Sequence, residues 1–329
     1  MDGNGEDRAN DDAAAAADFA SPFDRAEWFA LLEAHGFAGG GRYDAKATAG
    51  GATAWLPLRA EKPGHFAGLT NWYSFAIRPL YEGSGDRAAA LAALFGDLRK
   101  RAARVSLYPV RDGDRAAIRS ALRTAGWWLT ASPAGDRHWL DLSDMDHDRW
   151  WASRPGALRS TVQRKAKKRV VDIELSTRFD AANWDAYEDI YAASWKPEEG
   201  DPALLRAFAE AESARGTFRM GLARIEGAPV AAQFWTVEDG TAFIHKLAHV
   251  EDSLKASPGT LLSAALFRHV IEVDGVKRVD FGTGNDAYKR DWMNRHEPLW
   301  RIEAFNPSRI AAWGPASKAF VRSMLGIDT

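Results

Sequence analysis

The order of strand-like and helix-like segments after residue 170 constrains the fold more than any other feature of the sequence. Gly227 and the Asp239-Gly240 pair separate three apolar runs, and such residues favour tight hairpin turns. We therefore expect these runs to form an antiparallel meander. The expected segments are a strand at 171–176, helices at 184–195 and 202–215, and the three strands 218–225, 229–237 and 241–249.

A further helix and strand follow the meander. Ser257-Pro258-Gly259-Thr260 opens a segment whose apolar positions keep a 3.6-residue period, and Gly275 ends it before the strand-like run 276–281. Strands that alternate with helices in this way predict a mixed α/β layer structure.

The first half of the chain shows a similar alternation of strand-like and helix-like segments, which suggests a duplicated fold. Strand-like runs at 53–58, 105–109 and 127–130 alternate with helix-like segments at 87–104 and 114–125. We expect four parts: a disordered acidic and alanine-rich tail at 1–20, a first half at 21–145, a basic connecting helix at 146–170, and a second half at 171–329.

Composition excludes several classes of function. The chain has no cysteine, so thiol nucleophiles, disulfides and thiolate metal sites are absent, which fits a reducing cytoplasm. A formal net charge of −2 argues against general affinity for nucleic acid, DNA included. The N-terminal residues lack the pattern of a secretory signal. The sequence contains no apolar run of about 18 residues, so we expect no membrane span. We expect no metal cofactor.

Gly282, Gly284 and Ala287 match the G-x-G-x-x-A spacing of a dinucleotide-binding turn. Such a turn must stand early in its domain, because further strand–helix units have to complete the sheet. Only 45 residues follow Gly284, and they contain three prolines. The glycines are better explained as a sharp exit from the sheet that brings backbone close to a ligand or a neighbouring strand.

Three phrases carry a resemblance to a known fold. They are LRSTVQRKAKKRV at 158–170, PVAAQFWTVEDGTAFIHKLAH at 229–249, and SPGTLLSAALFRHVIEVDGVKRVDFGTGNDAYKRDW at 257–292. Together with the element order, they resemble the GNAT acyltransferase fold, in particular proteins related to the Fem peptidoglycan-bridge transferases and to BioF2-like or CelD-like acetyltransferases. The resemblance covers mainly 155–305. It implies a tandem GNAT-like α/β fold, with mostly antiparallel twisted sheets flanked by helices, a degenerate first copy and a catalytic second copy.

The resemblance implies that acetyl-CoA or another acyl-CoA is the co-substrate. Its pyrophosphate would lie at the N-terminus of the helix after Ser257, where backbone N–H groups and the helix dipole favour an anion. The family motif there is Q/R-x-x-G-x-G/A, whereas this chain has a single glycine, and an ordinary capped helix is the alternative. The expected donor-binding residues are Lys255, Ser257, Gly259, Thr260 and Leu261.

Four residues are candidates for catalysis. The resemblance places Tyr288 where GNAT enzymes carry a tyrosine that protonates the departing thiolate, although a core aromatic would look the same. Lys289 could contact a phosphate or carboxylate, or be a solvated lysine. His245 and Asp280 are alternative general bases. Strand alternation puts His245 on one face of its strand with Phe243, Leu247 and His249, and puts Ile244, Lys246 and Ala248 on the other.

The segment 154–169 contains seven basic residues and no acidic one. In a helix, Arg164 and Lys168 stand one turn apart, and like charges so placed suggest an anionic partner, unless the run is a solvated face. We expect Arg164, Lys168 and Gln233 to bind the acceptor, which would be a small molecule or a peptide or glycan precursor.

The leading hypothesis is therefore an N-acyltransferase that moves an acyl group from acyl-CoA directly to an amine of an anionic acceptor, and the resemblance implies acetyl-CoA as the first donor. An aminoacyl-tRNA-dependent ligase like the Fem relatives, or an inactive binding module of the same fold, are the alternatives. Only the ligase alternative would involve tRNA.

Overall fold

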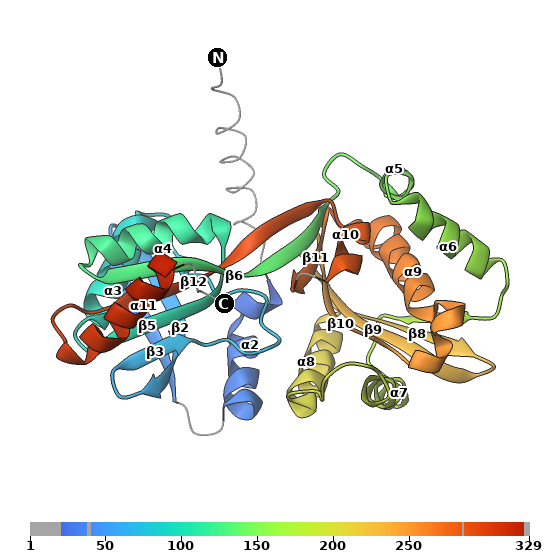
Figure 1. Cartoon of the computed structure of the whole chain (residues 1–329), viewed down its shortest axis with the longest axis horizontal. Coiled ribbons are helices and arrows are strands. Elements are labelled where there is room, and N and C mark those ends of the chain that lie inside the picture. The colour runs from blue at the N-terminus through green and yellow to red at the C-terminus, as the bar shows by residue number, and fades with distance from the viewer. Residues whose placement is uncertain (1–20, 38–40, 285, 326–329) are drawn as a thin grey trace, which may run out of the picture. The chain divides into compact units, whose positions relative to one another are not determined.

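The computed structural model describes residues 21–37, 41–284 and 286–325 (Figure 1). The chain divides into two compact units. Unit 1 holds the residues up to Asp136 together with those from Glu297 onward, and unit 2 is Arg137–His296. These two units have other bounds than the two halves expected at 21–145 and 171–329, because the residues after 296 belong to the first unit.

Unit 1 is a mixed sheet with helices. Its neighbouring strands follow the order β1-β2-β3-β5-β12-β6, and β4 pairs with β2. The elements are η1 (Pro22–Asp24), α2 (Ala26–Leu31), η2 (Leu32–Gly36), β1 (Arg42–Ala49), β2 (Ala52–Lys62), β3 (His65–Gly68), β4 (Leu80–Glu82), α3 (Arg87–Leu98), β5 (Arg104–Arg111), α4 (Asp112–Thr124), β6 (Trp128–Asp141), β12 (Arg295–Phe305), η4 (Ile310–Ala312) and α11 (Trp313–Leu325).

Unit 2 has the elements that the sequence analysis assigned to a catalytic GNAT copy. Its strand order is β6-β11-β10-β9-β8-β7, where β6 contributes its last residues. The elements are α5 (His147–Ala152), α6 (Gly156–Ala166), β7 (Asp172–Ser176), α7 (Ala181–Ala192), α8 (Pro202–Arg215), β8 (Phe218–Ile225), β9 (Ala228–Glu238), β10 (Thr241–His249), η3 (Glu251–Ala256), α9 (Pro258–Glu272), β11 (Arg278–Thr283) and α10 (Ala287–Trp292).

The predicted meander is confirmed as β8, β9 and β10. Glu226-Gly227 and Asp239-Gly240 have positive φ at both positions, as a two-residue hairpin turn of the favoured twist requires. The basic connecting helix predicted at 146–170 is divided into α5 and α6 in the structure, and α6 ends at Ala166.

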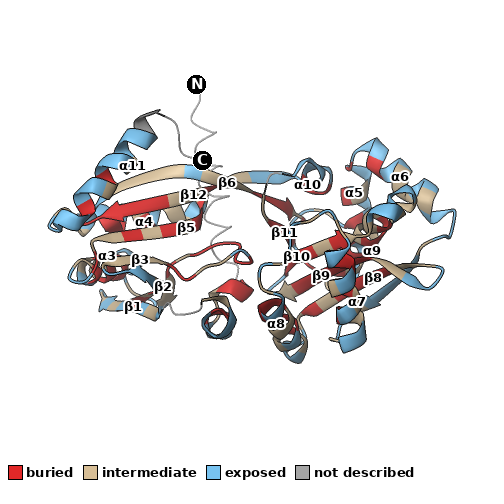
Figure 2. Cartoon of the chain, turned by 60° about the horizontal axis from the view of Figure 1, so that its bottom comes forward, coloured by how far each residue is buried: buried red, intermediate tan, exposed pale blue. Residues whose placement is uncertain are grey.

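Helices cover both faces of the sheet of unit 2. α7 and α8 pack on one face, and α9 packs on the other with α5 and α6 beyond it (Figure 1). Consecutive residues of β9 serve the two layers: Phe234 packs against Trp184 of α7, while Trp235 packs against Phe267 of α9. The strands between the layers are largely buried (Figure 2), so the predicted α/β architecture with a mostly antiparallel sheet is confirmed.

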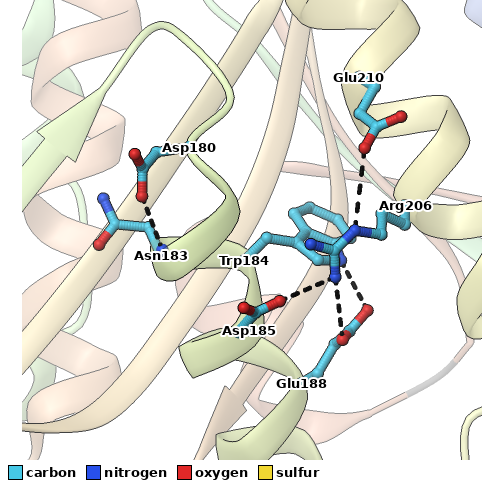
Figure 3. A network of polar contacts seen from close by, with 7 residues as sticks. All are labelled: Asp180, Asn183, Trp184, Asp185, Glu188, Arg206 and Glu210. Carbon is cyan, nitrogen blue, oxygen red and sulfur yellow. Dashed lines mark hydrogen bonds and ion pairs between the residues drawn. The ribbon is translucent and has the colours of Figure 1, made fainter.

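A polar network joins α7 to α8 and so fixes the start of the segment that follows α7 (Figure 3). Arg206 of α8 donates to Asp185 at 2.9 Å and to Glu188 at 3.3 Å, both on α7. Trp184 Nε1 donates to Glu188 at 2.8 Å, and the Asp180 carboxylate caps α7 through the Asn183 N–H at 2.9 Å. The residues after α7 reach the candidate site described below.

The two units share one topological device, which supports a duplication. In unit 2, β10 is connected through α9 to β11, and β10 and β11 pair in parallel. In unit 1, β3 is connected through the short β4 and then α3 to β5, and β3 and β5 also pair in parallel. A short parallel pair around a crossover helix therefore occurs in each unit.

Candidate active site

The parallel strands β10 and β11 pair only at their beginnings. The paired residues are Thr241 with Arg278, Ala242 with Val279, and Phe243 with Asp280. Within the described residues no pairing between these strands follows, so the end of β10 from Ile244 to His249 has β9 on one side and an opening on the other. Backbone groups that face such an opening are available to an extended ligand.

A buried ion pair fixes β11 at this point. Arg137 donates from Nε at 3.0 Å and from Nη2 at 2.7 Å to one oxygen of Asp280, and the Gly282 N–H donates to the other at 2.9 Å. Both side chains are almost fully buried. Asp280, expected from the sequence as a possible base, therefore lies in a structural pair with its oxygens engaged.

A β-bulge in β10 changes which way its side chains face. The register against β9 shifts between Ile244 and Lys246, so that strict alternation fails there. His245 contacts Phe208 of α8, and Lys246 lies over Tyr191 of α7, which places both on the same layer. The expectation that His245 and Lys246 face opposite sides is wrong, because a bulge adds a residue that the two-residue period does not count.

His245 sits in an aromatic setting. Its Nε2 shares a 2.8 Å hydrogen bond with Thr236, and its ring stacks on Phe234 at 5.0 Å. His245 thus contacts Thr236, Phe208 and Phe234, whereas Tyr288 and Lys289 contact Phe281.

Tyr288 and Lys289 meet on Phe281. The Tyr288 ring lies 5.6 Å from the Phe281 ring, and Lys289 Nζ lies 5.2 Å from the same ring centre. Lys289 Nζ donates to the Thr283 carbonyl at 2.6 Å and lies 3.6 Å from Asp286. Burial lowers the pKa of Lys289, while burial and the Asp286 carboxylate raise the pKa of Tyr288. Tyr288 is 40% exposed and stays protonated, so it can donate to a ligand.

Two lysines that the sequence analysis did not single out complete the site. Lys246 Nζ pairs with Glu199 at 2.7 Å, and the Tyr187 hydroxyl donates to the other Glu199 oxygen at 3.2 Å. Lys196 Nζ lies over Tyr191 at 5.8 Å, the same ring that Lys246 contacts at 5.1 Å. We call Lys196, Lys246 and Lys289 the lysine cluster.

Burial acts on the whole lysine cluster. It is the largest cause that lowers the pKa of Lys246, against the opposing Glu199 carboxylate. Burial and then the neighbouring Lys246 ammonium lower the pKa of Lys196 to about 8, and Lys289 adds to this effect. Among the described residues, no carboxylate lies within 4 Å of Lys196 Nζ. A desolvated ammonium of this kind favours an anionic ligand.

The loop before α9 holds the residues expected to bind the donor. Ser257 has a left-handed φ of 57°, and Pro258 begins the helix without an N–H, so the first amide of α9 belongs to Gly259. Gly259 faces the His249 ring, where an added Cβ would lie 3.4 Å from Nδ1. The side chain of Lys255 is exposed, and Leu261 is buried in the first turn.

Gln233 is buried and hydrogen-bonds to this turn, so its side chain is not exposed to an acceptor. Its Nε2 donates to the Gly259 carbonyl at 3.2 Å and to Ser263 Oγ at 2.7 Å, and its Oε1 accepts from Trp235. Arg164, in the last turn of α6, and Lys168, just after the helix, are both exposed. Their neighbour Lys165 donates to the Lys255 carbonyl, so the basic end of α6 lies beside the loop before α9.

One group of side chains has donor atoms close enough for a metal ion. His147, Asp148 and Glu272 bring them within 4.8 Å of one another. Glu272 ends α9, whose 15 residues put it roughly 20 Å from the helix start. This group therefore lies apart from the β10–β11 opening.

The arrangement matches a known domain. Residues 156–290 match the family model described as an acetyltransferase (GNAT) domain. A GNAT domain over these residues bears out the predicted N-acyltransferase. The predicted GNAT-like α/β fold, with a large and mostly antiparallel sheet flanked by helices, is confirmed.

Solved structures share the fold over most of the chain. FemX is 12% identical, with a TM-score of 0.66 over 91% of this chain and 96% of that one. The C-terminal domain of a putative lysylphosphatidylglycerol synthetase from Agrobacterium fabrum is 15% identical, with a TM-score of 0.56 over 86% and 88%. L-PGS from Bacillus licheniformis is 12% identical, with a TM-score of 0.55 over 88% and 93%. No curated protein matches the sequence.

We predict that Lys196 titrates far below an ordinary lysine. Since burial destabilises its ammonium, the folded protein binds this proton less tightly than the unfolded chain, and its contribution to stability rises with pH between about 8 and 10.5. After reductive methylation with ¹³C-formaldehyde, the NMR signal that is lost in Lys196→Arg should titrate near pH 8. A midpoint above 10 for that signal would contradict the site as described.

Proposed function

We propose that the protein transfers an acyl group from an acyl-CoA, with acetyl-CoA as the first candidate, directly to the amine of an acceptor that carries a carboxylate or phosphate. The observation that carries the proposal is the opening beside β10, with the lysine cluster and Tyr288 around it. The match of residues 156–290 to a GNAT domain, together with this opening, supports a thioester donor.

The donor would lie along the open edge of β10, past the last paired residue Phe243. Its amide groups would hydrogen-bond to the strand as an added strand does. Its pyrophosphate would lie at the start of α9, near Gly259 and Thr260, with Lys255 and Lys165 as the nearest cations on the loop and on α6.

In the reaction, the acceptor amine attacks the thioester carbonyl, a C–N bond forms, and the C–S bond breaks. The amine loses a proton, and the departing thiolate gains one. Tyr288 is the proposed acid, since its raised pKa keeps the hydroxyl protonated and its ring is held on Phe281. Lys289, held by Thr283 and Asp286, is the proposed positive group beside it.

The charge of the opening supports an anionic acceptor. Three lysines converge there against the carboxylates of Glu199 and Asp286, and Lys196 has no paired carboxylate among the described residues. A carboxylate or phosphate near Lys196 would restore the balance. The BioF2-like or CelD-like subgroup stays part of this proposal, as does a cytoplasmic site of action.

An aminoacyl-tRNA donor is the second candidate, and one local feature favours it. Pro258 removes an N–H from the helix start, and the exposed Glu251 and Asp252 stand just before it, so the loop is poorer for a pyrophosphate than the family motif. The exposed cations of α6 next to this loop would suit a nucleic-acid backbone.

The donor is tested by thermal unfolding and by thiol release. Acetyl-CoA at 100 times its dissociation constant should stabilise the protein by about 2.7 kcal/mol. Because the chain has no cysteine, a thiol reagent reports released coenzyme A without protein background. Tyr288→Phe should lower kcat by roughly 10²-fold or more without changing the shift with acetyl-CoA. No shift with any acyl-CoA, together with salt-sensitive tRNA binding, would favour the second candidate.

The acceptor class is tested with amines that differ only in an anionic group, such as phosphoethanolamine and ethanolamine, or glycine and glycinamide. The anionic member should be preferred, and Lys196→Gln should raise its KM by roughly 10-fold or more, the value of one charged hydrogen bond. The exposed Lys277→Gln in the same unit is the matched control. Equal use of both members, or equal effects of the two variants, would remove the support for an anionic acceptor.

A further inference from the structure

α11 in unit 1 has apolar residues on two sides. Ala316 in its first turns and Ala312, just before the helix, are buried with Phe305, and Ala319 is partly buried beside them. On another side, Trp313 and Val321, two turns apart, are 52% and 55% exposed. A helix of a folded domain normally turns polar residues to water, so an exposed apolar side indicates a surface that meets something else.

The exposed side extends beyond the helix. Ile310, one turn earlier, is 83% exposed, and Trp128 at the start of β6 is 45% exposed with its ring 6.5 Å from that of Trp313. Trp313 Nε1 donates to the Pro307 carbonyl at 3.0 Å, which fixes the ring in place. We call Trp128, Ile310, Trp313, Phe320 and Val321 the α11 surface; α11 is largely exposed in Figure 2.

Positive charge surrounds the α11 surface. The sequence from Ala304 to Leu325 contains Arg309, Lys318 and Arg322 and no acidic residue, and all three are exposed. The basic run Arg99-Lys100-Arg101 lies next to it: Arg309 donates to the Lys100 carbonyl at 2.5 Å, and Arg99 donates to Ser308 at 3.0 Å. One acidic neighbour, Asp97, is paired with Lys100 at 2.6 Å.

We propose that the α11 surface binds an anionic lipid bilayer, with α11 lying in the plane of the interface. Apolar and tryptophan side chains enter the headgroup boundary, and the surrounding cations meet anionic headgroups. A second copy of the chain is a poorer partner, since a symmetric contact brings Lys318 and Arg322 of both copies together. No helix in the described part of the chain is long and apolar enough to cross a membrane, and this mode of binding needs none.

The surface belongs to unit 1, and its proposed role does not depend on the donor or acceptor of unit 2. Variants of the α11 surface should therefore keep the response of the protein to acetyl-CoA, whatever that response is. Unchanged thermal unfolding of the variants shows that the fold is intact.

Co-sedimentation of the full chain with vesicles tests the proposal. Binding to phosphatidylcholine vesicles with 25% phosphatidylglycerol should exceed binding to pure phosphatidylcholine by at least 10-fold, and it should weaken as salt rises. The doubles Trp313→Ser/Val321→Ser and Lys318→Glu/Arg322→Glu should each lose at least 10-fold. Trp72→Ser, at a tryptophan that is 75% exposed elsewhere in unit 1, should not.

A labelled variant provides a direct reading of insertion. Because the chain has no cysteine, Phe320→Cys carries a single environment-sensitive dye, whose emission should shift to the blue with anionic vesicles. No vesicle binding at low salt, binding that neither double variant changes, or dimerisation through this surface without vesicle binding would overturn the proposal.

Discussion

The candidate site depends on the buried pair between Arg137 and Asp280. Asp280 is the last residue of β11 paired with β10, and it faces Trp139 of β6 on its other side. Removing either partner would leave a charge without compensation in the sheet, which typically costs about 3–5 kcal/mol. With the pair intact and the Gly282 N–H added, β11 can leave β10 at a fixed point and open the sheet without exposing an unsatisfied carboxylate.

Charged side chains of both signs lie around the opening. Each charge is unfavourable in a buried position without the opposite charge beside it. Glu199 receives Lys246 and the Tyr187 hydroxyl, and Asp286 lies near Lys289. Burial and then the Lys246 ammonium lower the pKa of Lys196, against the opposing carboxylates of Glu199 and Asp286. The proposed anionic acceptor would bind here because it replaces the water lost from these ammonium groups. Charge balance, more than shape, is the property of the site that points to a substrate.

Much of the fold could be predicted because its signals are local. The Asp239-Gly240 turn predicts a hairpin, and the 3.6-residue period after Pro258 predicts α9, whichever domain contains them. The return of β12 to unit 1 has no such signal, since strand pairing across the chain depends on which edge is free. The bulge before Lys246 is likewise invisible to a two-residue period, so the lysine that completes the site was assigned to the wrong face.

The same difference between local signals and long-range packing applies to the site residues. The resemblance in sequence indicates Tyr288, and the charge of Lys289 next to it makes that residue a candidate; the structure places both on Phe281. Gln233 and Asp280 carry polar side chains in strands, a pattern that indicates function and buried structural bonds equally well; here both have their partners within the protein. Lys196 follows a helix in a segment with no periodicity, and it comes to the opening through the Tyr191 ring of α7, which Lys196 and Lys246 both contact.

The proposed position of the donor along the open edge of β10 is the feature to test. Hydrogen–deuterium exchange with and without acetyl-CoA measures it directly, because a ligand that pairs with the strand protects its amides. We expect slower exchange at 244–249 and at 259–262, with unit 1 unchanged. Protection confined to unit 1, or no protection of β10 at a saturating acyl-CoA concentration, would contradict it.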